Sequence, residues 1–356
     1  PGPGVTARSP DIVVDADGAV HVLYAVPLNP QRGVYMTSSR DDGATWSDAA
    51  TIFDAEGAGW AMADHAALAM GPDGALHAVW SRGAAGGPFP PQGIVYARST
   101  DGGTTWSEPR TMAEGAYGWP AVAAPLAGRV HLLWGDAAAA GSWTHRRSTD
   151  GGATWEVLQQ VPGLRDVAGP LGLSADGAGT LHVLGLGRAE AGSAALHYVT
   201  WDAEAGRWQA QEPHPLPIEG GVLDGVAAAV AGPQGRLDVA FRAEAQPQDE
   251  EREPASDRPG EDRMLALFHT RREVPVVEER PEPAYTPQPT ATPTPGPTST
   301  PTPTPRPTVV PEAPEPTPPT VGIGPLSLPA MALVGVVFAV ALVIAVIVLR
   351  SRRGRP

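Results

Sequence analysis

The chain has 356 residues, with 42 glycines, 41 prolines, no cysteine and a formal net charge of −14. The lack of cysteine excludes disulfides and thiol chemistry, and the many turn-forming residues favour short β-strands. All 25 basic residues are arginine, which is typical of a GC-rich bacterial genome, and 39 acidic residues outnumber them. This acidic balance repels phosphate, so we expect no nucleic-acid partner.

The first repeated unit contains four strand-like runs in chain order. They are "DIVVD" at 11–15, "AVHVLYA" at 19–25, "GVYMTSS" at 33–39 and "TWSDAATIF" at 45–53. The second run alternates, so that Val20, Val22 and Tyr24 share one face. Four antiparallel strands of this kind would form one sheet of a repeat array.

A strand-like run that contains G-x-x-H or a variant occurs in every unit. His21, His77, His131 and His182 occupy its last position, and Asp238 takes the equivalent place in a fifth unit. A period of 51 to 56 residues with several short strands per unit is typical of a β-propeller. Histidines at one position of different units cannot converge on one ion, so we interpret them as structural. The sequence predicts an all-β propeller domain over 1–280 with five visible four-stranded blades.

An octet with the pattern S-x-D-x-G-x-T-W occurs three times, at 39–46, 99–106 and 148–155. Aspartate and glycine favour tight turns, so each octet is predicted to join the third and fourth strands of its blade, with Thr-Trp opening the fourth strand. We expect a structural role and no metal or cofactor; a metal site built from the aspartates is the alternative. The fixed positions are Ser39, Asp41, Gly43, Trp46, Ser99, Asp101, Gly103, Trp106, Ser148, Asp150, Gly152 and Trp155.

The octets resemble the Asp-box of the sialidase-like BNR-repeat family, and all three match it at every fixed position. The resemblance implies a β-propeller whose Asp-boxes are structural and lie on the face away from the ligand site. Sialidases have six blades. Here either the ring closes with five blades, or a sixth blade and an export signal lie upstream of Pro1.

The predicted ligand face collects the starts of the first strands and the ends of the second strands. Aromatic rings stack on sugar C–H faces, and arginines pair with acidic groups. Packing between blades is the alternative role for each aromatic ring. The ligand-binding candidates on this face are Tyr24, Trp60, Trp80, Arg82, Trp119, Trp134 and Asp136.

The resemblance also implies an activity. Sialidases grip the sugar carboxylate with three arginines, use a tyrosine nucleophile and protonate with an aspartate. The "ARSP" at 7–10 lacks the aromatic residue and isoleucine of the family motif, and the last blade has no tyrosine for the nucleophile. We therefore expect glycan binding, with an exo-α-sialidase as one alternative and a scaffold or adhesin as the other. The candidates for catalytic roles are Arg8, Arg188, Arg242, Tyr117 and Asp64.

The last quarter of the chain has a different character. Residues 281–329 are rich in proline and threonine, which predicts an extended, disordered stalk. Residues 330–349 are uncharged and apolar, long enough for one transmembrane helix, and 350–356 form a basic tail. Positive charge stays in the cytoplasm, so the propeller is expected outside the plasma membrane of a bacterial cell. The expected partner there is a glycan or a cell-surface protein.

Overall fold

A computed structural model describes residues 6–84, 90–139, 141–167, 169–189, 192–216, 227–232, 236–245 and 264–273. The chain divides into two compact units, Pro1–Gln288 and Pro289–Pro356, and every described residue belongs to the first. The predicted stalk, membrane span and basic tail lie outside the described residues. Within the described part, no helix is long and apolar enough to cross a membrane.

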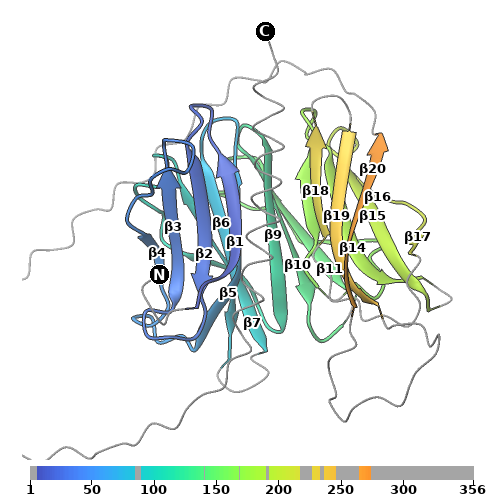
Figure 1. Ribbon diagram of the computed structural model, residues 1–356, viewed down its shortest axis with the longest axis horizontal. Helices are drawn as coiled ribbons and strands as arrows, with labels where there is room; N and C mark the ends of the chain where they lie inside the picture. Colours follow the sequence, from blue (N-terminus) through green and yellow to red (C-terminus); the bar gives the residue numbers. More distant parts are fainter. Residues whose placement is uncertain are drawn as a thin grey trace, which may run out of the picture. The chain divides into compact units, whose positions relative to one another are not determined.

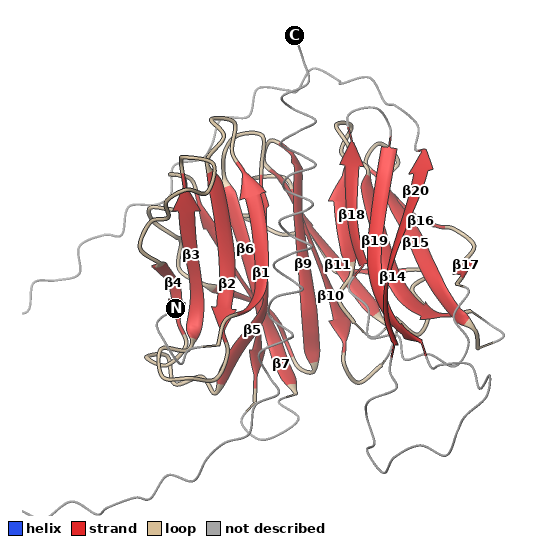
Figure 2. Cartoon of the chain, viewed as in Figure 1, coloured by secondary structure: helices blue, strands red, loops and turns tan. Residues whose placement is uncertain are grey.

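Every regular element in the described residues is a β-strand, and the strands form five antiparallel sheets that follow chain order (Figures 1 and 2). We call these sheets blades 1 to 5, because four of them have the four-strand order expected of propeller blades. Blade 1 contains β1 (Arg8–Val14), β2 (Val20–Val26), β3 (Gly33–Ser39) and β4 (Ala50–Asp54). Blade 2 contains β5 (Met62–Met70), β6 (Leu76–Gly83), β7 (Pro91–Ser99) and β8 (Arg110–Glu114).

The remaining strands make three further sheets. Blade 3 contains β9 (Tyr117–Leu126), β10 (Arg129–Asp136), β11 (Trp143–Ser148) and β12 (Gln159–Val161). Blade 4 contains β13 (Gly172–Ala175), β14 (Leu181–Arg188), β15 (Ala194–Asp202) and β16 (Arg207–Ala210), and β17 (His214–Pro215) also pairs with β15. Blade 5 has three described strands, β18 (Ala227–Gly232), β19 (Arg236–Ala245) and β20 (Met264–Glu273).

The first strand of each blade lies innermost. β1 packs against β5, β5 against β9, β9 against β13, and β13 against β18. The second, third and fourth strands follow outward by antiparallel pairing. Among the described strands, no packing of comparable extent joins blade 5 back to blade 1. One flank of blade 1 therefore has no described blade against it.

The predicted start of the fourth strand is wrong in all three blades that carry an octet, because β4, β8 and β12 begin at Ala50, Arg110 and Gln159, after the Thr-Trp pair. The third strand of blade 1 spans Gly33–Ser39 as predicted, but the fourth begins at Ala50, not at Thr45. The backbone N–H and hydroxyl of Thr45 both donate to the Asp41 carboxylate (2.8 and 2.6 Å). These bonds keep Thr45 in the turn, so it cannot open the strand.

The histidines at the repeat position are structural, as the sequence analysis expected. His77, His131 and His182 are each 2% exposed. Their Nδ1 atoms lie 2.8 Å from the Tyr96 hydroxyl, 3.0 Å from His145 Nε2 and 2.7 Å from the Tyr198 hydroxyl, respectively. Each bond therefore ties the second strand of a blade to its third strand, inside the core.

Candidate functional site

Each octet is held in its turn by hydrogen bonds between its own residues. In the second octet, Ser99 Oγ donates to Asp101 Oδ1 (2.7 Å), and the N–H and hydroxyl of Thr105 donate to the two oxygens of the same carboxylate (2.9 and 2.5 Å). The Trp106 indole N–H donates to Gly103 O (3.2 Å). The other two octets repeat the serine and threonine bonds to their aspartates. The three carboxylates thus serve three separate turns.

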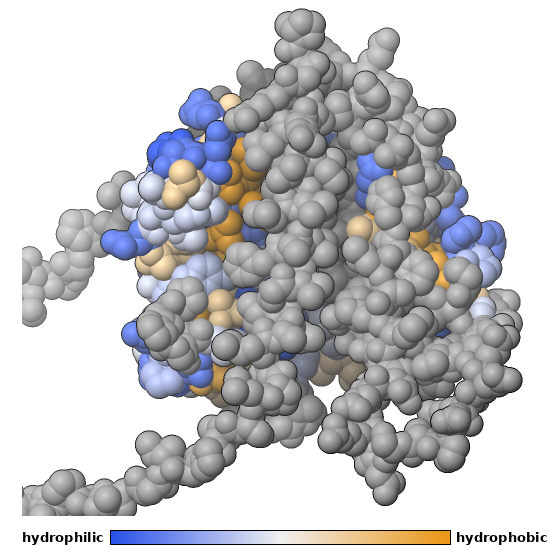
Figure 3. Space-filling view, viewed as in Figure 1, coloured by the Kyte–Doolittle hydropathy of each residue, from blue (hydrophilic) through white to orange (hydrophobic). Residues whose placement is uncertain are grey.

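The octets of blades 2 and 3 also contact the preceding blade. A Cβ added at Gly103 would lie 2.0 Å from Met36 Cε of blade 1, and one added at Gly152 would lie 2.0 Å from the Tyr96 hydroxyl of blade 2. Arg98 of blade 2 donates to the carbonyl of Gly151 in the third octet (2.7 Å). In the first octet, by contrast, Trp46 is 46% exposed. The charged loops at this end of blade 1 are hydrophilic in Figure 3.

The inner strands begin at the other end of the blades with an unusual backbone. Ser9, His65, Trp119 and Asp166 have φ between 49° and 55°, in the left-handed region. The first three each lie twelve residues before the buried histidine of their own blade (9 and 21, 65 and 77, 119 and 131). The strand register shifts at the same places. Such conformations cost about 1–3 kcal/mol each and often occur at binding sites, and bulges re-aim side chains.

These entrances bring side chains from neighbouring blades together. Arg8 Nη1 lies 3.4 Å from Asp64 Oδ2, and Ser9 Oγ donates to Asp64 Oδ1 (3.1 Å). The Asp64 side chain is 4% exposed, whereas the Arg8 side chain is 57% exposed. The buried carboxylate therefore holds one side of a guanidinium whose other side faces solvent. We call Arg8, Ser9, Asp64, His65 and Trp119 the inner-strand cluster.

The hydrogen bonds around His65, the next member of this cluster, define the tautomer of its ring. The Ser81 hydroxyl donates to the Asp64 carbonyl (2.9 Å), so its oxygen accepts from His65 Nδ1–H (3.0 Å). Burial lowers the pKa of His65, against the opposing effect of Asp64, so the ring is neutral near pH 7. Nε2 is then an acceptor. The His65 ring centroid lies 6.0 Å from that of Trp119.

Two predicted ligand residues occupy the core instead. Trp80 and Trp134 are 0% and 1% exposed, and they pack between blades 1 and 2 and between blades 2 and 3. Rings so buried cannot stack on a ligand. The packing alternative therefore holds at both positions.

The other candidates have different partners. The Arg82 guanidinium lies over the Trp60 ring, 5.1 Å from its centroid. Asp136 Oδ1 accepts from Ala138 N–H in its own turn (2.8 Å), and Arg188 donates to Gly192 O of its own loop (2.8 Å). Tyr117 packs against the core between blades 2 and 3. The Arg242 side chain lies outside the described residues.

Sequence reasoning found Arg8, Asp64 and Trp119 but missed Ser9, His65 and Ser81. The shared spacing of Ser9, His65 and Trp119 from the buried histidines was available in the sequence. However, a serine, a histidine and a tryptophan share no side-chain chemistry that would mark a left-handed strand entrance.

No family model matches the chain, and no curated protein matches it. Among solved structures, it is similar to a protein of unknown function from Dyadobacter fermentans (15% identity, TM-score 0.49, covering 67% of this chain and 78% of that one). It is also similar to the Hadza microbial sialidase Hz136 (16%, 0.48, 67% and 55%) and to a GH62 α-L-arabinofuranosidase from Coprinopsis cinerea (15%, 0.43, 75% and 91%). The chain thus spans little more than half of that sialidase. These TM-scores are below 0.5, so the fold assignment rests on the chain's own sheets.

Proposed function

We propose that the chain is a β-propeller that binds a glycan at the inner-strand cluster. The observation that carries the proposal is the Arg8–Asp64 pair, which lies where blades 1 and 2 meet, on the end opposite the octets. The solvent-facing guanidinium can donate to sugar hydroxyls or to a carboxylate, and neutral His65 can accept from a hydroxyl. The Trp119 ring can stack on the C–H face of the sugar.

Binding is better supported than hydrolysis. A sialidase-type grip needs several arginines aimed at one carboxylate, but Arg188 is bonded to its own loop and Arg8 is shared with Asp64. A ligand held by one arginine and one ring needs no nucleophile. We retain an exo-α-sialidase-type activity as an outcome that the experiment below can detect.

We further propose that the propeller is displayed outside the bacterial plasma membrane. The support is sequence alone: a proline- and threonine-rich segment over 281–329 and an uncharged apolar segment over 330–349 followed by arginines. Protease added to intact cells should release the propeller from the surface. Retention of the intact chain inside the cell would contradict this localisation.

The binding site is tested with the full chain on a glycan array, beside Arg8→Ala, Trp119→Ala and the control Trp46→Ala. We expect the first two variants to weaken binding about tenfold or more, equivalent to about 1.4 kcal/mol. The control removes an exposed ring from the octet end and should bind normally. Circular dichroism establishes that each variant is folded.

Two results would count against this proposal. If Arg8→Ala binds as tightly as the unaltered chain, the cluster is not the ligand site. If the unaltered chain turns over a fluorogenic sialoside and Arg8→Ala does not, the chain is an enzyme of the sialidase type instead.

A further inference from the structure

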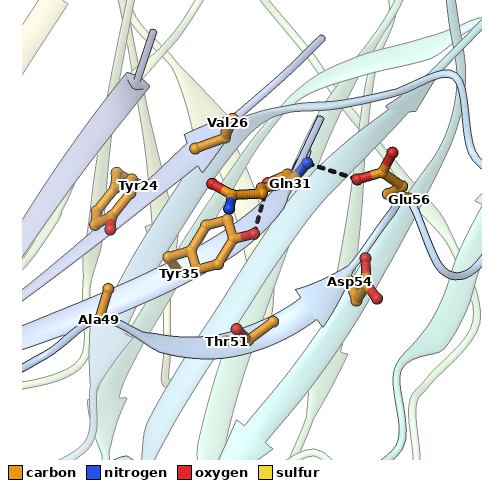
Figure 4. A pocket seen from close by; sticks show the side chains of 8 residues that line it. All are labelled: Tyr24, Val26, Gln31, Tyr35, Ala49, Thr51, Asp54 and Glu56. Carbon is orange, nitrogen blue, oxygen red and sulfur yellow. Dashed lines mark hydrogen bonds between the residues drawn. The ribbon is translucent and has the colours of Figure 1, made fainter. Parts of the chain in front are cut away.

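A hollow lies on the flank of blade 1. Its volume is about 450 Å³, and it is lined by residues of β2, β3, β4 and the neighbouring loops (Figure 4). Figure 4 shows Tyr24 and Ala49 at one end, Tyr35 and Gln31 in the middle, and Asp54 and Glu56 at the other end. The hollow therefore has an aromatic end and an acidic end. We call it the flank pocket.

Comparison between blades explains why this space is open. Tyr24 occupies the position in β2 that Trp80 occupies in β6 and Trp134 in β10. In blades 2 and 3 the preceding blade covers that ring. The centroid of the Trp80 ring, for example, lies 5.5 Å from that of Phe53 in blade 1. No described blade precedes blade 1. Figure 3 shows an apolar strip near β1. Ile12 and Val14 of this strand are half-buried.

The aromatic end is a rigid platform. The rings of Tyr24 and Tyr35 stack at 5.7 Å with an angle of 20°. Tyr24 is 7% exposed and Tyr35 is half-buried, so Tyr35 is the more accessible ring. The Tyr35 hydroxyl donates to the Gln31 carbonyl (2.5 Å), which fixes the ring against the loop. The platform is thus formed before any ligand arrives, which lowers the entropic cost of binding.

Several polar groups around the platform have no hydrogen-bond partner among the described residues. Asp54 Oδ1 accepts from Gly57 N–H (2.9 Å), but Oδ2 accepts no bond from a described residue. Glu56 is engaged by Gln31 N–H (2.6 Å) and by Arg32 (3.6 Å), whereas the Gln31 side-chain amide makes no described bond. An acceptor and an amide therefore remain available beside an apolar ring.

We propose that the flank pocket binds an uncharged sugar ring. The C–H face of the sugar lies against Tyr35, and its hydroxyls donate to Asp54 Oδ2 and bond to the Gln31 amide. The lining contains two carboxylates and no basic residue, so it repels anionic sugars. The pocket is wide and shallow with few polar partners, and we expect a dissociation constant of about 1 mM. This proposal does not depend on the inner-strand site.

The test is saturation-transfer NMR on the full chain with a panel of methyl glycosides, some neutral and some carrying a carboxylate. In the Arg8→Ala variant, which lacks the guanidinium of the inner-strand cluster, neutral glycosides should give transfer and carboxylated ones should not. Tyr35→Ala should reduce the affinity at least fivefold, as should Asp54→Asn. Tyr35→Phe keeps the ring and should retain binding, and Arg8→Ala should leave this site unchanged.

Three outcomes would overturn the proposal. The first is that no neutral glycoside binds at 10 mM. The second is that binding by the Arg8→Ala variant survives both Tyr35→Ala and Asp54→Asn. The third is that a protein partner or a second copy covers the flank, which concentration-dependent association abolished by Tyr24→Glu would reveal. If Tyr35→Ala does not fold, the Asp54→Asn and Tyr35→Phe variants still decide the matter.

Discussion

At the scale of single residues, burial and hydrogen bonding give the repeated histidines their role. Burial lowers the pKa of His77 to about 3, and that of His145 also to about 3. Both rings are therefore neutral in the folded chain. They join strands through the Tyr96 hydroxyl and through His131.

A pH dependence of stability follows from these pKa values. Between about pH 3 and 6.5 the unfolded chain takes up a proton at each histidine that the folded chain does not. This contribution is complete above pH 6.5 and falls as the pH falls. We expect His77 and His145 together to cost about 2 kcal/mol of unfolding free energy between pH 6.5 and 5.5.

Urea denaturation at several pH values measures this loss, and His77→Gln should reduce its slope by about one proton. The octet aspartates do not interfere, because their pKa values are also lowered and they titrate below this range; the Thr45 hydroxyl and N–H cause this at Asp41. An unfolding free energy that stays constant from pH 7 to 5.5 would show that the histidines are not buried neutral.

At the scale of elements, the octets act as turns and as contacts between blades. The fixed glycine of the pattern has nearly the same φ in every octet, 88° at Gly43, 86° at Gly103 and 85° at Gly152. The surroundings differ. A Cβ added at Gly43 would have the Trp46 ring of its own octet as its nearest neighbour, at 3.8 Å. At Gly103 the added Cβ would meet the flexible Met36 side chain, and at Gly152 it would meet the hydrogen-bonded Tyr96 hydroxyl.

Replacing each of these glycines with alanine should therefore give a graded loss of stability. Gly43→Ala carries only backbone strain, about 1 kcal/mol. Gly103→Ala must also displace Met36, for about 2 kcal/mol, and Gly152→Ala must break the Tyr96–His77 contact, for about 3 kcal/mol or more. Urea denaturation of the three variants supplies the comparison. Equal losses would mean that the octets do not pack on the preceding blade.

The sequence predicted the positions of the strands better than it predicted what packs against their side chains. Alternation and turn residues were enough to place β3, because the side-chain period of a strand is visible locally. An aromatic residue at the end of a second strand is ambiguous, because a ring that packs between blades and a ring that meets a ligand occupy the same position. Trp80 packs against the preceding blade, whereas Tyr24, at the same position of blade 1, has no described blade against it. The neighbouring blade, not the local sequence, decides between the two environments.

At the scale of the whole molecule, the repeat period predicted five blades, and five sheets follow one another in the described chain. The inner strands bring residues about 55 positions apart, such as Arg8 and Asp64, into contact. No local pattern contains that contact; it arises from the stacking of blades. The sequence therefore predicted that residues of the inner-strand cluster lie on one face of the propeller, but not which of them contact one another.

In the proposed molecule, the octets form a structural end and the inner-strand cluster forms a ligand end. A crystal structure of the chain with a bound oligosaccharide tests this directly. We expect sugar density within hydrogen-bond distance of Arg8 and in contact with the Trp119 ring. Density at the octet turns, against Trp46, Trp106 or Trp155, with none at the inner-strand cluster, would contradict it.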